Sequence, residues 1–270
     1  MPRKKYAVAA LLFGDNPMYH LFAKLLFDQL RRQGYFAVAD PILITVGDID
    51  PKPWTDKGIQ VIPARLREYP VRHNGPCPEV FYKYEIYRLT DYEKVLFTDI
   101  DVVVEGFDPF LFKMPTPLFL LEQHVPLACG NMLIKPDKDD YSALVELALN
   151  GHYHPASGWQ NCGKAPAWPS WHRRLFPGRF LDSTYPLIRE HSWNFFYAAS
   201  EQGLLYYWHT YCKPGYSSYH FPSFFHLAGE GRSALLLTDD ESTFWVACRM
   251  AGLEAEMREA MRYDVALRTQ

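Results

Sequence analysis

The sequence lacks the features that mark several classes of protein. With a net charge of −3, it has no excess of basic residues for nucleic acid. No apolar run is long enough to predict a transmembrane segment. The five cysteines are scattered and form no Cys-x-x-Cys pair, which argues against a disulfide framework or zinc cluster. They favour a reducing compartment, and we expect a cytoplasmic protein.

Two common phosphate-binding signatures are also missing. The sequence contains neither the Gly-x-Gly-x-x-Gly of dinucleotide-binding sheets nor a Walker lysine loop. Its 48% hydrophobic and 22% charged residues are typical of a globular chain, and its length suits one α/β domain. Aromatic residues gather in the second half. They favour a site with flat apolar surfaces, as carbohydrate sites often have.

The spacing of apolar residues predicts an alternation of strands and helices. We expect strands at residues 6–13, 42–46, 59–62, 95–97, 102–104, 118–121 and 127–134. We expect helices at 18–33, 80–89, 136–150 and about 239–262, the last packing on the sheet or on the partner subunit of a homodimer. A basic head before the first apolar range resembles a signal peptide, but the turn after it favours a strand. This order predicts a sheet with ligands at the carboxyl ends of its strands.

An acidic pair interrupts one apolar stretch. Asp99 and Asp101 stand between the strands expected at 95–97 and 102–104. In an extended segment their side chains point to one face while Ile100 points to the other. Buried carboxylates are costly without a partner, so we expect them to hold a divalent cation. A loop with two solvated acids is the alternative.

Residues 92–104, with Phe107–Phe112 after them, resemble the metal-binding segment of the glycogenin-like glycosyltransferases, family eight. The resemblance implies a GT-A-like α/β fold, that of nucleotide-diphospho-sugar transferases, with a mostly parallel central sheet flanked by helices. It implies one catalytic domain over residues 1–270. It also implies metal-dependent, retaining transfer of a hexose from a UDP-sugar to a hydroxyl on a glycan, protein or small molecule. Mn²⁺ is the expected ion, with Mg²⁺ as the alternative.

The segment after residue 223 resembles the family's His-Phe-x-Gly-x-x-Lys motif. It makes His226 the third metal ligand beside Asp99 and Asp101. Gly229 would let the backbone approach the pyrophosphate, and Arg232 stands where the family has lysine. The Pro-Trp that usually follows is missing.

The resemblance also places the donor site. The further candidate donor-binding residues are Tyr19, Lys83, Ile100, Glu122, Gly130 and Asn131, of which Glu122 is a candidate because it ends the strand expected at 118–121. Tyr19 would stack on uracil or else pack on the core. Lys83, or Arg88, would reach the phosphates, and a solvated surface lysine is the alternative. Glu122 would accept hydrogen bonds from sugar hydroxyls. Asn131 is displaced from the family's asparagine, so the donor sugar stays open.

The segment Glu201-Gln202-Gly203 resembles the family's Asp-Gln-Gly. It makes Glu201 the candidate catalytic carboxylate and Gln202 its neighbour. Retention could proceed through a covalent intermediate on Glu201 or by same-face attack with the donor phosphate as base. The alternative is a surface helix that starts at a capping Ser200.

An aromatic, irregular region at about 151–180 is expected to be an insertion on the acceptor side, with a tryptophan that stacks on a sugar. A packed surface excursion is the alternative. His152 and His154 have no third partner at metal-ligand spacing, so we do not expect zinc there. Two other functions stay open: an inverting or other nucleotide-sugar transferase of this fold, and a catalytically impaired UDP-sugar-binding protein.

Overall fold

The computed structural model describes residues 3–72, 78–120, 125–165, 193, 195, 197–219, 224–226, 252–253 and 255–258. Glu122, Gly229 and Arg232 lie outside the described residues, as do residues 166–180 of the region 151–180 and most of the expected helix 239–262. The chain divides into two compact units, which are described separately. The first comprises residues 1–66, 96–113 and 221–270, and the second residues 67–95 and 114–220.

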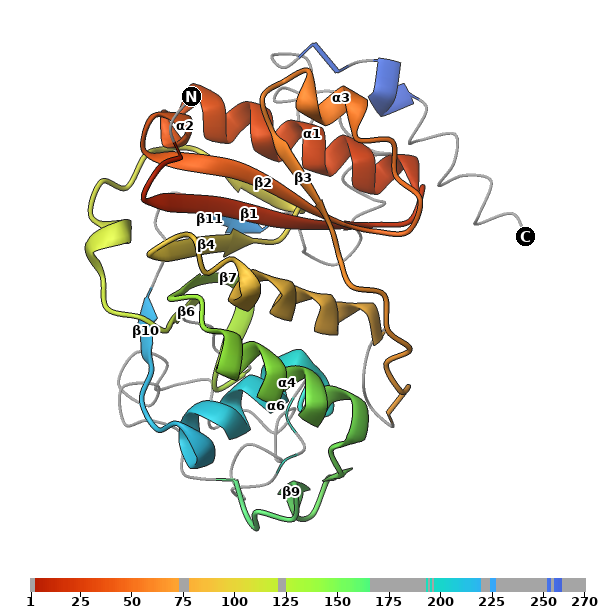
Figure 1. The fold of residues 1–270 in the computed structure, drawn as a ribbon, viewed down its shortest axis with the longest axis vertical. Coiled ribbons are helices and arrows are strands. Elements are labelled where there is room, and N and C mark those ends of the chain that lie inside the picture. Colours follow the sequence, from red (N-terminus) through yellow and green to blue (C-terminus); the bar gives the residue numbers. More distant parts are fainter. Residues whose placement is uncertain are drawn as a thin grey trace, which may run out of the picture. The chain divides into compact units, whose positions relative to one another are not determined.

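The first unit is built on a parallel ladder (Figure 1). Its strands are β1 (Tyr6–Phe13), β2 (Ala39–Val46) and β3 (Gln60–Pro63). Between β1 and β2 runs the helix α1 (Pro17–Arg32), followed by the short α2 (Tyr35–Val38). The side chain of Asn16 caps α1 by accepting a hydrogen bond from the amide of Met18. These elements confirm the predicted strands and helix to within a few residues at their ends.

Four further short elements are among the described residues of the first unit. They are α3 (Lys52–Thr55), β5 (Val102–Val104), the 3₁₀ turn η2 (Leu111–Lys113) and β11 (Phe224–His226). The last strand, β11, pairs antiparallel with β5. The strand β4 (Lys94–Thr98) carries the chain from the second unit into the first.

The second unit contains its own strands and helices. They are η1 (Pro78–Arg88), β6 (Leu118–Leu120), β7 (Ala128–Ile134), α4 (Lys138–Asn150), β8 (Tyr153–His154), β9 (Gly158–Trp159), α6 (Glu201–Tyr207), η5 (Trp208–Cys212) and β10 (Ser217–Tyr219). Strand β6 pairs parallel with β10 and antiparallel with β7. The fold class is therefore mixed α/β with mostly parallel strands, as predicted.

The segment predicted as a helix at 80–89 differs in kind. It is a 3₁₀ helix, η1, and every residue from Phe81 to Tyr87 is buried. Long 3₁₀ helices are uncommon in isolation. Here the rings of Phe81, Tyr84 and Tyr87 pack edge to face along it. Tertiary packing on all sides therefore decides the helix type, which apolar spacing cannot reveal.

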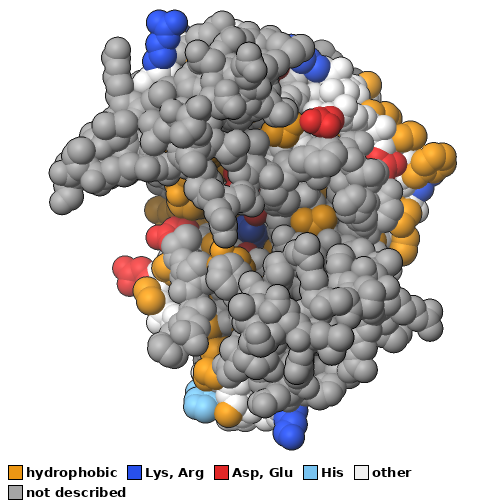
Figure 2. Space-filling view, turned by 180° about the vertical axis from the view of Figure 1, so that it is seen from behind, with side chains coloured by type: hydrophobic (Ala, Val, Ile, Leu, Met, Phe, Trp, Pro, Cys, Tyr) orange, Lys and Arg blue, Asp and Glu red, His pale blue; other side chains and the backbone are white. Residues whose placement is uncertain are grey.

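On the face shown in Figure 2, the described basic side chains lie apart from one another among acidic and apolar ones. No helix within the described part of the chain combines the length and the apolar character needed to cross a bilayer.

Candidate active site

The acidic pair lies in a turn of the first unit. Asp99, Ile100 and Asp101 form the tight connection between β4 and β5. Asp101 is only 5% exposed, whereas Asp99 and Ile100 are half-buried. The two carboxylates thus follow a strand that is buried from Val95 to Thr98 and precede one that is buried throughout. The alternative raised by the sequence, a loop with two solvated acids, is therefore wrong for Asp101.

The pairing of β11 with β5 brings a distant residue beside this turn. His226 is the register partner of Val102, the residue directly after Asp101. Opposite residues of an antiparallel pair have their Cα atoms about 4.5–5.5 Å apart. The backbone of His226 therefore lies next to that of Asp101, although the two are far apart in the sequence.

This arrangement fits a divalent ion in its donor set. Two carboxylates and an imidazole suit Mn²⁺ better than Mg²⁺. Among the side chains that the structure describes, which do not include that of His226, no three His, Cys, Asp or Glu residues gather as a metal site. The fit thus rests on the backbone register and on the identity of the donors.

Tyr19 occupies the first turn of α1, close to the carboxyl end of β1. Its ring packs edge-on against Phe13, the last residue of β1, with 5.2 Å between the ring centroids. The side chain is only half-buried. Both predicted roles, core packing and a stacking surface, therefore stay compatible with its position.

In the second unit, Lys83 and Glu201 form a buried ion pair. Lys83 Nζ lies 3.3 Å from Glu201 Oε1, and the two side chains are 9% and 3% exposed. Lys83 belongs to η1, and Glu201 is the first residue of α6. The alternatives of a solvated lysine and a surface helix start are therefore wrong. The fold brings together two predicted site residues that lie far apart in the sequence.

Two side-chain oxygens in the first turn of α6 have no hydrogen-bond partner. Glu201 Oε2 and Gln202 Oε1 are both buried and make no hydrogen bond. Unpaired buried oxygens are rare because each loses its hydration without replacement. They are therefore candidate contacts for a bound ligand.

The main chain at Glu201 is fixed by two groups that sequence reasoning missed. Tyr84 donates a hydrogen bond of 3.1 Å from its hydroxyl to the carbonyl oxygen of Glu201. Burial raises the pKa of Tyr84 well above its usual value, so the phenol stays neutral and can donate. Gly203 is the second, because its lack of a side chain lets the start of α6 pack against the main chain of Ala198. A Cβ at Gly203 would lie 1.8 Å from the carbonyl oxygen of Ala198.

Ser200 precedes α6 but does not cap it with its side chain. Its hydroxyl donates instead to the carbonyl oxygen of Tyr197, at 2.8 Å. The close approach of Ala198 to Gly203 gives the glycine of the Glu-Gln-Gly segment a packing cause, which the motif alone does not show.

Gly130 and Asn131 lie within β7. Both are buried, and Asn131 has no exposed surface. The segment Ala128–Asn131, which differs from the family's asparagine motif, therefore belongs to a buried strand of the second unit and not to a surface loop.

Comparisons with known proteins identify the fold. No family model and no curated protein matches the sequence. Among solved structures, the glycosyltransferase GlyE of Streptococcus pneumoniae TIGR4 is 13% identical, with a TM-score of 0.53 over 98% of this chain. An active-site mutant of LgtC is 12% identical, with a TM-score of 0.51 over 92% of this chain and 95% of that one.

These likenesses define the class of fold. The chain spans 64% of the GlyE chain, a little under two thirds. Both neighbours are glycosyltransferases, and the chain shares their GT-A fold, as the resemblance to the glycogenin-like enzymes predicts. At such low identity the likeness extends to the fold and not to the substrates.

Proposed function

We propose that the chain is a retaining glycosyltransferase that moves a hexose from a UDP-sugar to an acceptor hydroxyl. The observation that carries the proposal is the register of β11 on β5, which sets the backbone of His226 beside Asp101. The GT-A fold supports sugar transfer from a nucleotide sugar in general. The UDP donor, the metal and the retaining course are the finer parts of the proposal.

In this proposal Asp99, Asp101 and His226 hold a divalent ion, preferably Mn²⁺. When bound, the ion supplies Lewis-acid stabilisation of the charge on the departing diphosphate. Tyr19 contacts the uracil, and Ile100 lies against the donor between the two acids. Gly229 and Arg232, outside the described residues, are proposed to contact the pyrophosphate.

Glu201 is the proposed catalytic carboxylate. Lys83 holds Oε1 through the ion pair, which leaves the unpartnered Oε2 for the sugar. The carboxylate then either attacks the anomeric carbon or stabilises positive charge there during same-face attack. Gln202 offers its unpartnered Oε1 to a hydroxyl.

The sugar and the acceptor have proposed contacts of their own. Gly130, Asn131 and Glu122 are proposed to line the donor sugar. The region at 151–180 is proposed to receive a carbohydrate or protein hydroxyl. Partner-subunit contacts through the helix at 239–262 and a cytoplasmic location remain proposals.

A thermal-shift comparison tests the nucleotide and the metal together. UDP with Mn²⁺ should raise the melting temperature, since a ligand at about 100 times its Kd stabilises by about 2.7 kcal/mol. UDP without metal should have little effect, and Asp101→Asn should abolish the shift. Asp56→Asn, an exposed acid of the same unit, is the matched control. Equal stabilisation by every nucleotide, or an unchanged shift in Asp101→Asn, would reject the proposal.

The departures from the family pattern favour a second candidate, a catalytically impaired UDP-sugar-binding protein. Ala128–Asn131 replaces the family's asparagine motif, and Pro-Trp is missing after Arg232. Slow UDP-glucose hydrolysis with Mn²⁺ that is lost in Asp101→Asn would exclude this candidate. NMR of the product's anomeric linkage would separate retention from an inverting transferase.

A further inference from the structure

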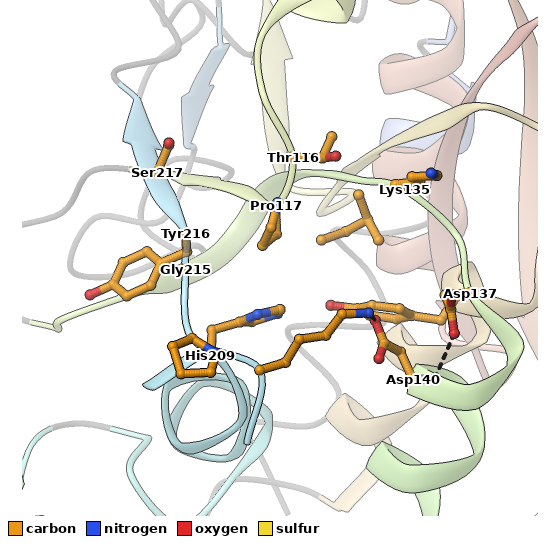
Figure 3. Close-up of a pocket in the computed structure, with 13 residues that line it drawn as sticks. Thr116, Pro117, Lys135, Asp137, Asp140, His209, Gly215, Tyr216 and Ser217 are labelled. Carbon is orange, nitrogen blue, oxygen red and sulfur yellow. Dashed lines mark hydrogen bonds and ion pairs between the residues drawn. The ribbon is translucent and has the colours of Figure 1, made fainter. Parts of the chain in front are cut away.

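The second unit contains a cavity that the proposed reaction does not use. Its volume is about 640 Å³, within the usual range for small-molecule sites. It lies at the start of β6 and the end of β7, beside the first turn of α4 and the segment from η5 to β10 (Figure 3). Its His209 stands eight residues after Glu201, in η5, which directly follows α6.

Two buried polar side chains of this cavity have unpartnered atoms. His209 is 4% exposed and Tyr87 is 1% exposed. His209 Nε2 and the Tyr87 hydroxyl make no hydrogen bond. Figure 3 shows the imidazole of His209 reaching into the cavity below Pro117. Two orphaned polar atoms from separate elements on one cavity indicate a place for a ligand that can hydrogen-bond to both.

Both groups are uncharged. Burial lowers the pKa of His209 to about 4, against a weaker opposing hydrogen bond with the main chain of Lys213. Burial likewise raises the pKa of Tyr87 well above its usual value. A neutral imidazole nitrogen can donate or accept according to its tautomer, and a phenol can do both. Both groups can therefore form hydrogen bonds with the hydroxyls of an uncharged ligand.

The charges at the rim of the cavity cancel. Lys213 Nζ lies 2.7 Å from Asp140 Oδ2 in an ion pair. Lys135 and Asp137 add one charge of each sign, and Asp137 Oδ1 accepts hydrogen bonds from the amides that begin α4. The cavity therefore has no net charge that would favour an anion or a cation. Its apolar lining comes from Pro117, Ile134 and Pro214.

We propose that this cavity is a binding site for a neutral mono- or disaccharide, separate from the donor site. Sugar hydroxyls bond to His209 Nε2 and to the Tyr87 hydroxyl, and a C–H face of the ring packs on Pro117 and Pro214. The inference does not require the chain to transfer sugars.

NMR of the full chain with ¹⁵N-labelled histidines tests the proposal directly. The His209 resonance is the one missing from His209→Gln. Titration with glucose, galactose, N-acetylglucosamine and maltose should shift it saturably for at least one sugar, with a Kd in the millimolar range. Tyr87→Phe should weaken that sugar about tenfold, the equivalent of one hydrogen bond.

Two further variants separate this site from the donor site and from effects on folding. Ser217→Trp fills the cavity from a half-buried position and should abolish the shift. Asp101→Asn, which alters the proposed donor site in the first unit, should leave it unchanged, because Asp101 lies outside the cavity. The proposal is overturned if no sugar shifts His209, or if inorganic phosphate binds there more tightly than every sugar. It is equally overturned if the shift survives Ser217→Trp or disappears in Asp101→Asn.

Discussion

Lys83 and Glu201 form an ion pair of 3.3 Å in which both side chains are more than nine-tenths buried. The pair joins η1 to α6, two helices separated by more than a hundred residues of sequence. Two buried charges stabilise each other only while both are present, since either one alone keeps its full desolvation cost. The proposed catalytic carboxylate is therefore also part of what holds the second unit together.

Removing one partner of this pair should cost more than removing both. We expect Lys83→Met and Glu201→Gln each to lower the free energy of unfolding by about 3 kcal/mol, and the double variant by clearly less than the sum. Urea denaturation of the four proteins measures this coupling.

The pair Lys213–Asp140 is the matched control, because its lysine side chain is 56% exposed. Its coupling between Lys213→Met and Asp140→Asn should stay below about 1 kcal/mol. Strictly additive losses at Lys83 and Glu201 would show that the two side chains do not stabilise each other.

Gly203 should not tolerate a side chain. The Cβ of Gly203→Ala would lie 1.8 Å from the carbonyl oxygen of Ala198 and 2.4 Å from its carbon. These are backbone atoms, so the first turn of α6 must shift and carry Glu201 with it. We expect a loss of about 3 kcal/mol or more in urea denaturation, as for severe overpacking.

Gly58→Asn provides the comparison for Gly203. Gly58 has φ +74° and open space where a Cβ would be, and asparagine accepts this backbone conformation better than most residues. Its stability should change by less than about 1 kcal/mol. If Gly203→Ala is no more destabilising than Gly58→Asn, the close packing at Ala198 is not a constraint on α6.

The sequence predicts the parallel strands well because apolar runs and turns are local signals. Strand β1 begins and ends where the pattern places it, and α1 lies within one residue of its predicted limits. It predicts the position of η1 to within two residues but not its 3₁₀ type, since a segment buried on every side is shaped by tertiary packing. The burial of Lys83 follows from the same packing and has no local signal.

The residues themselves predicted the types of the site residues, and only the resemblance to the glycogenin-like enzymes predicted His226 as the partner of the two acids. The acids at Asp99 and Asp101 stand out because they interrupt apolar runs. The register that sets His226 beside them depends on two short strands far apart in the chain. The contact of Tyr84 with the backbone of Glu201 depends on η1 and α6 meeting, which no motif encodes.

His209 should make stability depend on pH in a defined window. Its pKa is lowered from 6.5 to about 4 by burial, so the unfolded chain takes up a proton before the folded one as the pH falls. The stability that the neutral ring contributes is complete above about pH 6.5 and is lost progressively towards about pH 4. The loss amounts to about 3 kcal/mol, at 1.36 kcal/mol per pKa unit.

Comparison with His209→Gln isolates this effect, because all other groups, including the neighbouring Lys213 and Asp140, are the same in both proteins. Urea denaturation from about pH 7 to about pH 4.5 should show wild type losing stability faster than the variant. The difference between the two should therefore shrink or reverse at the acid end. Parallel curves would mean that His209 titrates normally in the folded chain.

Arg72 should be irreplaceable by lysine, although the change keeps the charge. Its guanidinium lies over the ring of Trp159, 4.8 Å from the centroid, and donates to the carbonyl oxygens of Ala148 and Gly151 at 2.7 and 3.2 Å. It thus closes the last turn of α4, where carbonyls lack helical partners and the helix dipole favours a cation. A lysine ammonium cannot stack flat while reaching two carbonyls. We expect Arg72→Lys to cost about 2 kcal/mol in urea denaturation.

Arg32→Lys, on the exposed pair with Asp28, should cost less than about 0.5 kcal/mol. Equal losses in the two variants would mean that the flat guanidinium does not hold the end of α4.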